Sequence, residues 1–498
     1  MKHLRTERLL RIAVWCAFLV VISFTSADPD LWGHVRFGLD MLRDGHIRAA
    51  DTYSFTSDRV WVNHEWAAEV VAAIAYKLGA DAGLVLLKLM VVGSVLLLLD
   101  ISLRREGIES AFARDVTAGA TIFMTVSQAH HVRPQLFSLL FFSVLLTCLL
   151  AARRGSLRSL LILPPLFALW ANLHGGWIVG GAVMIVWTTG LLASKQARLA
   201  AATVLTGALS LLATLATPYG LTLWRFLYET VGLSRPEIIE WQPLYVVGPL
   251  FIGLWATALA VVVMSVIAGG REHVRVERIL VAIVLAAVSM KVSRLIAFFG
   301  LASAFLFAPA ICHAYQRRRR QARLDSAAGL RFGFVALACG VAITALLLVR
   351  DNFWQLRLDT ASMPGPEAVR FLENESAGNR VLVWFSWGEY AIWHLSPRMQ
   401  VSIDGRRETV YSDSMQTRHF DFFFDRGAGA TLPDDLAADY VWIPRVLPAV
   451  HRLETDRRWI QAYKDDQSVI FVRAGLPTTG RPPVVATTGT NDRLFPGP

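Results

Sequence analysis

Two carboxylates stand two positions apart, Asp28 and Asp30, directly after the first apolar run of the chain. If that run crosses a membrane, both side chains lie at the membrane surface, where buried charges persist only with a partner or a task. The plainer alternative is a solvated helix terminus, in which Asp30 caps the helix that follows. The pair is therefore the first candidate for chemistry at a membrane surface.

The residues after this pair predict two helices that lie along the bilayer. In residues 31–45 one helical stripe is apolar, formed by Leu31, Val35, Leu39 and Leu42. Gly45 is a typical helix end, and residues 64–79 form a second amphipathic stretch beside the first. A loop of this kind holds carboxylates and cations at the depth of a lipid phosphate group.

The composition predicts a membrane protein with many spans. Of 498 residues, 54% are hydrophobic and 18% are charged, and the mean hydropathy is +0.44, values that do not fit soluble domains. The net charge of +10 lies wholly in the apolar part, because residues 1–349 hold 32 Lys and Arg against 20 Asp and Glu, whereas residues 350–498 hold 17 against 19. In apolar regions such cations set membrane orientation, so we expect no nucleic-acid partner.

We predict an α-helical membrane domain in residues 1–349, with about eleven transmembrane helices. The apolar runs are residues 9–27, 82–103, 111–129, 136–151, 157–173, 178–192, 200–217, 246–268, 279–290, 296–314 and 332–349. Lys and Arg gather in alternate loops, which places these loops and the N-terminus in the cytoplasm of a bacterial inner membrane. A hairpin turn is expected at Lys291 and Arg294, because a single helix through them would exceed the bilayer.

An odd number of spans leaves residues 350–476 outside, in the periplasm or extracellular space, where they have the pattern of a small α/β domain. Strand-like runs lie at residues 380–385, 399–404, 439–443 and 468–472, and helical stretches at 365–374, 387–394 and 449–456. Pro, Gly and Thr dominate residues 477–498, which predicts a disordered tail. Residues 28–80 are assigned to the membrane domain as its first outer loop.

The first outer loop resembles that of the GT-C membrane glycosyltransferases. The spacing of Asp28, Asp30 and Arg36 is similar to the acidic pair and trailing Arg of the oligosaccharyltransferase catalytic subunit. Residues 64–79, followed by a span, resemble the second loop helix of the mannosyl- and aminoarabinose-transferase branches. In the tail, residues 383–406 resemble the aromatic WWDYG-type segment of oligosaccharyltransferases. The resemblance covers the topology of nearly the whole chain, whereas its specific motifs cover only these stretches.

The resemblance implies an enzyme that moves a sugar from a polyprenyl phosphate or pyrophosphate carrier to a glycan, lipid or protein acceptor, among membrane lipids. Asp28 and Asp30 would activate the acceptor, as a general base or through bound Mg²⁺ or Mn²⁺. Guanidinium groups present a planar fork to phosphate oxygens. The candidates for binding the donor phosphate are Arg36, Arg133 and Arg294.

The sequence departs from the oligosaccharyltransferase pattern in the next outer loop, residues 127–135, which contains no carboxylate. His130 and His131 in that loop, or Glu237 or Glu240 in a later one, would then replace the missing metal ligands beside the acidic pair. Adjacent histidines point to different sides of a helix, so hydrogen bonds to neighbouring groups are an equal alternative. A metal-free mechanism, like that of the mannosyltransferase branch, fits the sequence as well.

Several other residues are candidates for substrate contact, and each has a structural alternative. They are His34, His64, Glu65, His174, Trp387, Tyr390, Asp404 and Arg406. The histidines and Glu65 would otherwise bond to loop carbonyls or begin a helix. The aromatic residues would pack in a core, and the last two residues would form a structural ion pair.

Two other functions compete with sugar transfer. A transporter or flippase for lipid-linked glycans would place charges within its spans or break helices at bilayer depth, and the sequence has few such charges, with Lys88 and Asp100 in one span. A non-catalytic membrane scaffold, whose outer domain binds a partner, would leave the acidic pair dispensable.

Overall fold

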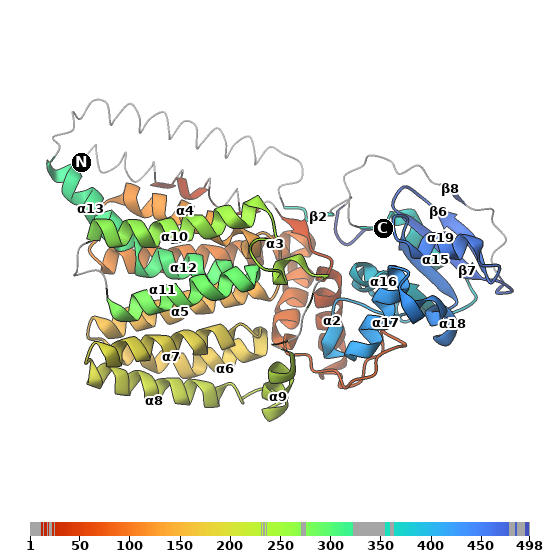
Figure 1. Ribbon diagram of the computed structural model, residues 1–498, viewed down its shortest axis with the longest axis horizontal. Helices are drawn as coiled ribbons and strands as arrows, with labels where there is room; N and C mark the ends of the chain where they lie inside the picture. The colour runs from red at the N-terminus through yellow and green to blue at the C-terminus, as the bar shows by residue number, and fades with distance from the viewer. Residues whose placement is uncertain are drawn as a thin grey trace. The chain divides into compact units, whose positions relative to one another are not determined.

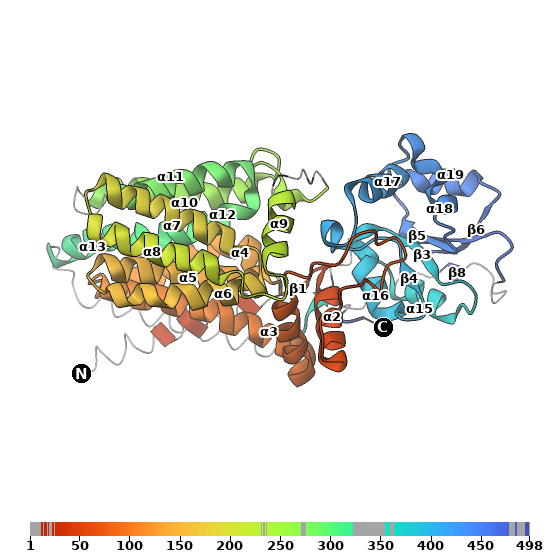
Figure 2. The ribbon, with the colours of Figure 1, turned by 90° about the horizontal axis from the view of Figure 1, so that it is seen from below.

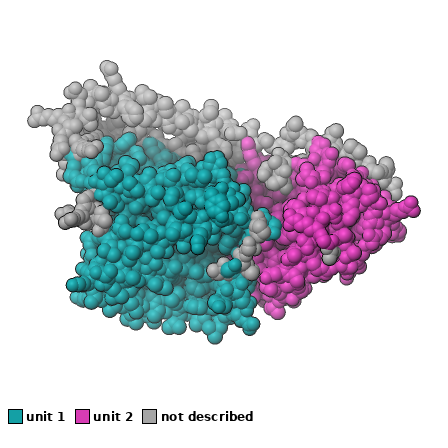
Figure 3. Space-filling model, viewed as in Figure 1, with its two compact units in different colours: residues 1–25, 84–354 teal, residues 26–83, 355–498 magenta. Residues whose placement is uncertain are grey.

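The structure is a computed structural model. It describes residues 11–12, 14–16, 18, 22–23, 25–230, 232, 235, 237–269, 275–321, 354–358, 363–477, 484–485 and 494–497. The chain forms two compact units (Figure 3), unit 1 with residues 1–25 and 84–354 and unit 2 with residues 26–83 and 355–498. This division differs from the predicted domains. The sequence assigns the loop of residues 28–80 to the membrane domain, whereas its contacts group it with the C-terminal residues in unit 2.

Unit 1 is a bundle of helices, most of which run side by side (Figures 1 and 2). It contains the second part of α3 (Trp66–Arg105), then α4 (Ala111–Ala129), α5 (Gln135–Arg153), α6 (Leu163–Leu173), α7 (Trp177–Ala193), α8 (Ala197–Ala213), α9 (Leu221–Thr230), α10 (Pro249–Gly269), α11 (Val276–Lys291), α12 (Ile296–Leu306) and α13 (Ala308–Gln321). Short 3-10 helices are η1 (Leu157–Ile162), η2 (Ile239–Trp241) and η3 (Ser293–Leu295).

Apolar side chains cover the outside of this bundle as well as its interior. Ile185, Leu205 and Ile267 are 64%, 63% and 79% exposed, on a surface that a soluble protein would bury. Among the described residues, four helices are long and apolar enough to cross a membrane: α3, α5, α10 and the stretch Ser293–Arg317. The chain is a multi-pass membrane protein.

The helices of unit 1 lie close to the predicted spans. α4 coincides with residues 111–129, and the predicted turn is present, because α11 ends at Lys291 and α12 begins at Ile296. α9 is a helix that the sequence reading does not anticipate. The predicted span 332–349, part of the first span 9–27 and most of the tail 477–498 lie outside the described residues.

The loops predicted to be cytoplasmic meet at one end of the bundle. Arg153 Nε lies 2.9 Å from Glu277 Oε1, and Arg154 Nη1 lies 2.5 Å from Glu106 Oε1. These pairs join the end of α5 to the start of α11 and to the residue after α3. The alternate connections, which carry the candidate site residues of unit 1, therefore lie at the opposite end of the same helices.

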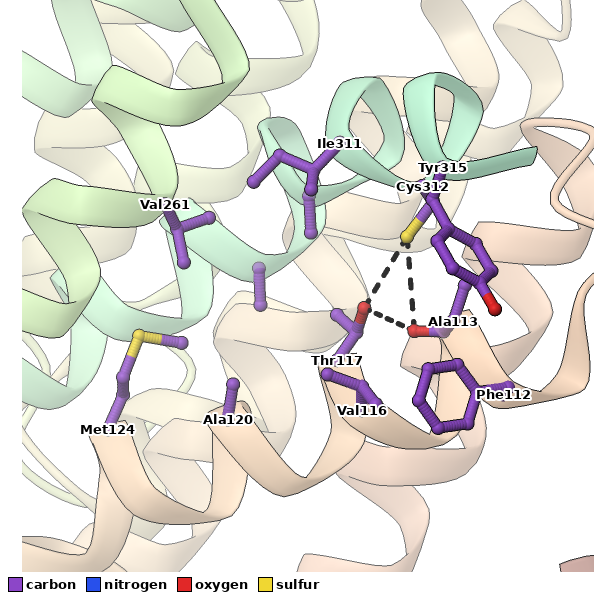
Figure 4. Close-up of a pocket in the computed structure, with 12 residues that line it drawn as sticks. Phe112, Ala113, Val116, Thr117, Ala120, Met124, Val261, Ile311, Cys312 and Tyr315 are labelled. Atoms are coloured by element: carbon purple, nitrogen blue, oxygen red, sulfur yellow. Dashed lines mark hydrogen bonds between the residues drawn. The ribbon is translucent and has the colours of Figure 1, made fainter. Parts of the chain in front are cut away.

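An apolar cavity of about 210 Å³ lies between α4, α10, α12 and α13 (Figure 4). Phe112 and Tyr315 lie at one end of it, with ring centroids 5.8 Å apart, and Met124 lies at the other. The described residues that line it include no Asp, Glu, His, Lys or Arg, so the cavity offers no acid–base pair for the predicted chemistry.

Unit 2 is built on a six-stranded mixed sheet with the strand order β4-β3-β5-β7-β6-β8. β3 pairs in parallel with β4 and β5, β7 pairs antiparallel with β5 and β6, and β8 pairs in parallel with β6. The strands are β3 (Arg380–Val383), β4 (Gln400–Val401), β5 (Tyr440–Pro444), β6 (Trp459–Lys464), β7 (Ser468–Arg473) and β8 (Val484–Val485). β5 and β7 are buried along nearly their whole length, as strands covered on both faces are.

The helices of this C-terminal part are α15 (Pro366–Asn374), η4 (Phe385–Trp387), α16 (Gly388–Leu395), η5 (Arg407–Thr409), α17 (Asp413–Phe423), η6 (Gly427–Thr431), α18 (Leu432–Asp435) and α19 (Ala449–Thr455). The four predicted strand-like runs coincide with β3, β4, β5 and β7, and the three predicted helices with α15, α16 and α19. The sequence reading misses β6, which alternates only weakly between buried and exposed positions, and α17.

Residues 26–83 are tied to the C-terminal residues by backbone hydrogen bonds. β1 (Ser26–Ala27) pairs in parallel with β2 (Arg357–Leu358) as a separate two-stranded sheet. Farther along, Val401 N donates to Tyr53 O (3.0 Å) and Phe55 N donates to Val401 O (3.1 Å). The loop thus pairs with the edge strand β4, whose backbone groups would otherwise need another partner.

α2 (Leu31–Asp44) packs against protein on more than one side. Its buried apolar residues are Leu31, Trp32, Val35, Phe37 and Met41. Leu42, which also belongs to the predicted stripe, is 39% exposed. A Cβ on Gly38 would lie 2.1 Å from Glu69 O, so α2 lies directly against the first part of α3 (Figure 2). The buried face is broader than a bilayer-lying helix needs, because α2 also contacts α16.

We predict that acid destabilises unit 2 through His419 of α17. This side chain is fully buried with Nδ1 2.9 Å from Met415 O, and burial lowers the pKa of His419 from 6.5 to about 4. Only the unfolded chain takes up this proton between those values, so stability falls as the pH drops from about 6.5 to about 4. In His419→Leu, the thermal midpoint in detergent should fall less over that range than in the wild type. His451→Leu, on α19, is the matched control, and an unchanged slope in His419→Leu would contradict the prediction.

Candidate functional site

The acidic pair forms the start of α2. Asp28 is 2% exposed, and its Oδ1 accepts a hydrogen bond from Asp30 N (3.0 Å) while its carbonyl oxygen accepts from Leu31 N (2.9 Å). Asp30 occupies the N-cap position, but in the described structure its side chain makes no capping hydrogen bond. The plainer alternative, in which the Asp30 carboxylate caps α2, is therefore wrong, and Asp28 orders the turn instead.

Glu389 of α16 borders this turn, and the sequence reading misses it. Its Oε2 accepts a hydrogen bond from Gly33 N (3.1 Å). A Cβ on Gly405 would lie 2.4 Å from Asp30 Oδ1 and 2.9 Å from Glu389 Oε1, so both carboxyl groups border the same glycine. Burial raises the pKa of Glu389 well above its ordinary value, and the charge of Asp30 acts in the same direction. The sequence does carry a signal for Glu389, because it is a carboxylate between Trp387 and Tyr390 in the WWDYG-like segment.

His34 lies one helical turn beyond Asp30, beside two further carboxylates. Its Nδ1 is 3.6 Å from Glu69 Oε1, and Asn63 Nδ2 donates to Glu69 Oε2 (2.6 Å). Burial disfavours the imidazolium, but Glu69, Glu65 and Asp30 outweigh it and raise the pKa of His34. The predicted residues His34 and Glu65 therefore share an electrostatic neighbourhood with the acidic pair.

The predicted pair Asp404 and Arg406 forms a buried ionic network. Arg406 Nη1 lies 2.8 Å from Asp51 Oδ1, and Arg406 Nη2 lies 2.7 Å from Asp404 Oδ2. Tyr411 OH donates to the same Asp404 oxygen (2.7 Å), and the guanidinium carbon is 4.7 Å from the ring centre of Trp61. These contacts tie the first loop to the C-terminal part, which favours the structural alternative over substrate contact.

Three other predicted residues of unit 2 also serve the packing. Arg36 Nε donates to Asp40 Oδ2 (3.0 Å) and its Nη1 to Trp393 O (3.3 Å), so this guanidinium is committed to holding α2 against α16. Trp387 and Tyr390 are 2% and 1% exposed. Their rings have no face available for an acceptor, and core packing is the better account of both. His64 Nε2 lies 3.7 Å from Glu65 Oε1 at the start of α3.

In unit 1, the two remaining arginine candidates converge on one carboxylate. Arg133 Nη1 and Arg294 Nη1 lie 3.2 and 3.3 Å from Glu240 Oε1. The ring of Trp241 lies 4.2 Å from the guanidinium carbon of Arg235 and 5.3 Å from that of Arg294. Arg235 is a member of this cation cluster that the sequence reading misses.

Lys88 is a buried cation in the apolar second part of α3. Its Nζ donates to Thr25 Oγ1 and to His130 O, the latter at 3.0 Å. His130 and His131 stack edge to face with ring centroids 4.8 Å apart. His174 is another predicted site residue. Its Nδ1 accepts a hydrogen bond from Gly176 N (3.0 Å) and lies 2.6 Å from Ser138 Oγ, so neighbouring groups satisfy this atom. A lysine within a span is itself a functional signal, and Lys88 belongs with the candidates.

The metal prediction stays a prediction. Among the described residues, no group of three or more His, Cys, Asp or Glu side chains is arranged to hold a metal ion. Glu240 already lies between two guanidinium groups, which makes it a poorer cation ligand. Asp28 and Asp30 remain the predicted ligands, because carboxylate oxygens are the hard ligands that Mg²⁺ or Mn²⁺ prefers.

We predict that Arg406→Met destabilises the protein rather than removing a substrate contact. The substitution leaves Asp51 and Asp404 buried without their counter-charge, which costs about 3–5 kcal/mol. The thermal midpoint and the amount of folded protein should both fall, while the exposed control Arg370→Met should change neither. A variant Arg406→Met with the wild-type midpoint and no activity would restore the predicted role in substrate contact.

The sequence matches no protein-family model, and no curated protein shows significant sequence similarity to it. Solved structures do match. The oligosaccharyltransferase of Archaeoglobus fulgidus, solved with a tethered acceptor peptide containing the NVT sequon, aligns with a TM-score of 0.55 and 13% identity over 88% of this chain and 69% of its own. ArnT of Cupriavidus metallidurans, bound to undecaprenyl phosphate, aligns with a TM-score of 0.56 and 12% identity over 93% of this chain and 97% of its own. The chain therefore has the fold of the GT-C membrane glycosyltransferases.

Proposed function

We propose that this protein is an integral membrane glycosyltransferase that transfers a sugar from a polyprenyl phosphate or pyrophosphate carrier to an acceptor outside the cytoplasm. The observation that carries the proposal is the acidic turn at the start of α2, where Asp28 orders the backbone and the Asp30 carboxylate is not used as a helix cap. The fold supports the class of reaction. The bound lipid of ArnT and the acceptor peptide of the oligosaccharyltransferase illustrate the two kinds of partner that such a fold accommodates.

In the proposed reaction, an acceptor hydroxyl or amide attacks the anomeric carbon of the donor sugar. Its proton passes to a carboxylate of the acidic pair, and the bond from the anomeric carbon to the carrier phosphate oxygen breaks. Asp30 is the proposed base, and Asp28, whose Oδ1 accepts a hydrogen bond from Asp30 N, orders the turn that carries it. A bound Mg²⁺ or Mn²⁺ would instead polarise the acceptor, with Asp28 and Asp30 as its ligands.

The carrier phosphate is proposed to bind at Arg133 and Arg294 in unit 1. A carboxylate and a phosphate accept hydrogen bonds from guanidinium groups in the same way, so Glu240 occupies the position between these cations that a phosphate oxygen would take. Lys88 adds a buried cation in the same unit. Arg36 is the weaker candidate for the donor phosphate, because both Asp40 and the backbone carbonyl of Trp393 accept hydrogen bonds from it.

The two charged residues within a span that would have favoured a transporter, Lys88 and Asp100, both have structural partners. Lys88 bonds to Thr25 and His130 O at one helix end, and Asp100 pairs with Arg104 and Arg114 at the other. Both charges are thus accounted for by contacts at the ends of the bundle rather than by a path through it. The alternation of cationic loops supports the inner membrane of a bacterium, with the N-terminus in the cytoplasm and the C-terminal residues outside.

The proposal predicts that Asp30→Asn lowers turnover by about a hundredfold or more, since general-base catalysis contributes 10²–10⁴. Asp28→Asn should also abolish transfer, because it removes the charge of one carboxylate of the acidic pair while keeping an oxygen acceptor for Asp30 N. The measurement is transfer of labelled sugar from a polyprenyl-linked donor by the purified protein in lipid bilayers.

Asp413→Asn, an exposed carboxylate in the first turn of α17, is the matched control and should retain full activity. Wild-type transfer in both Asp28→Asn and Asp30→Asn, with normal accumulation, would remove the acidic pair from the mechanism and favour the scaffold alternative. Adding a chelator to the same assay decides the metal question, because loss of transfer with rescue by Mg²⁺ or Mn²⁺ requires the metal-assisted form.

A second prediction concerns the donor. Arg294→Ala should raise the KM for the polyprenyl-linked sugar about tenfold or more, because hydrogen bonds to charged groups contribute about 1.5–3 kcal/mol. Arg225→Ala on α9, whose side chain is 82% exposed, is the control and should leave KM unchanged. An unchanged KM in Arg294→Ala would place the phosphate at another site.

A further inference from the structure

The first turn of α2 is held from a distant part of the chain. The first backbone N–H groups of a helix lack partners within the helix and are usually capped by a side chain close in sequence. Here the acceptor for Gly33 N is Glu389 Oε2, 356 residues away. The Asp30 side chain does not cap the helix, so α16 supplies an acceptor for this turn in addition to the hydrogen bonds that Asp28 accepts.

Three glycines allow the Glu389 carboxyl to lie this close. A Cβ on Gly33 would be 2.1 Å from Glu389 Oε2, and a Cβ on Gly388 would be 2.2 Å from Ile403 O. A Cβ on Gly405 would meet both Glu389 and Asp30. Segments from α2, α16 and the turn after β4 therefore approach one another at distances that only glycine permits.

The contact places the Glu389 carboxyl group beside Asp30. Glu389 Oε1 and Asp30 Oδ1 are no farther apart than the sum of their distances to the Gly405 Cβ position, 2.9 and 2.4 Å. Glu389 itself is 3% exposed. A buried carboxyl group costs free energy unless it is hydrogen-bonded, and an ordinary Ser or Asp near the helix start would have capped α2 without that cost.

We propose that Glu389 is a positioning residue, which holds the first turn of α2 through Gly33 and sets the place of the Asp30 carboxylate against Gly405. This inference rests on the proposed function, in which Asp30 acts on the acceptor. Removing the contact displaces the base without removing it, and a misplacement of about 1 Å costs about a hundredfold in rate. Donor binding, which uses cations of unit 1, does not depend on the contact.

The test compares four variants with the wild type. Glu389→Gln keeps an oxygen acceptor for Gly33 N and should retain kcat within about threefold. Glu389→Ala should lower kcat about 10- to 100-fold with the KM for the donor unchanged. Gly33→Ala should have a similar effect, because its new Cβ meets the Glu389 oxygen. In Gly33→Ala/Glu389→Ala that clash is gone, so the double variant should be no worse than Glu389→Ala alone. Glu367→Ala, an exposed carboxylate of α15, is the matched control.

A second readout does not require activity. Amide hydrogen exchange of residues 31–34 should accelerate in Glu389→Ala and stay at the wild-type rate in Glu389→Gln. Wild-type exchange and kcat in Glu389→Ala would overturn the inference, and so would an equal loss in Glu389→Gln with a raised KM, because that pattern belongs to a direct substrate contact. If the wild-type protein transfers no sugar while exchange still accelerates in Glu389→Ala and not in Glu389→Gln, the proposed function is refuted. The contact between Glu389 and Gly33 would then still hold the turn.

Discussion

A buried guanidinium is the interaction on which the organisation of unit 2 depends. Arg406 pairs with Asp404 two residues before it and with Asp51 in the first loop, 355 residues away. Without it, two carboxylates would face each other in an apolar interior, and the loop would lose its strongest tie to the sheet. The acidic turn, α2 and the first part of α3 all lie within the segment that this ion pair secures. A catalytic loop held in this way behaves as part of a folded unit rather than as a mobile connection between spans.

The candidate groups are already ordered without substrate. In unit 2, Asp28 accepts a backbone hydrogen bond, Glu389 accepts another, and Glu69 lies between Asn63 and His34. In unit 1, Glu240 keeps two guanidinium groups together. Groups that are fixed before the substrate arrives need little reorganisation during the reaction, which is the main way in which a protein stabilises developing charge. In the proposed reaction, the Asp30 carboxylate is the base, and the Glu240 carboxylate occupies the position where the donor phosphate would bind.

Local patterns predicted most of the elements, and contacts between distant residues decided the rest. Hydropathy located the helices of unit 1 other than α9, and the cations Lys291 and Arg294 marked the turn between α11 and α12. The resemblance drew attention to Asp28 and Asp30. Of the three arginines predicted to bind the phosphate, Arg36, Arg133 and Arg294, the structure brings the last two together on Glu240. These features depend on residue type and on neighbours along the chain, which a sequence displays directly.

Other features depend on partners that no local pattern reveals. Arg36 was expected at a phosphate, but Asp40 lies one helical turn away and Trp393 O comes from a distant helix. The buried face of α2 was misjudged because it packs on two protein elements. Trp387 and Tyr390 belong to a core that assembles only when the sheet forms. Glu389 stayed unnoticed for the same reason, since its partner Gly33 is hundreds of residues away and carries no side chain to signal the contact.

The most direct measurement is a cryo-electron microscopy map of the full chain in lipid bilayers with an added polyprenyl phosphate. We expect density for the phosphate between the guanidinium groups of Arg133 and Arg294, with the Glu240 carboxylate turned away from the position that it now occupies. Phosphate density bound elsewhere, with both guanidinium groups still on Glu240, would contradict the proposed donor site and with it the assignment of a lipid-linked sugar donor to this protein.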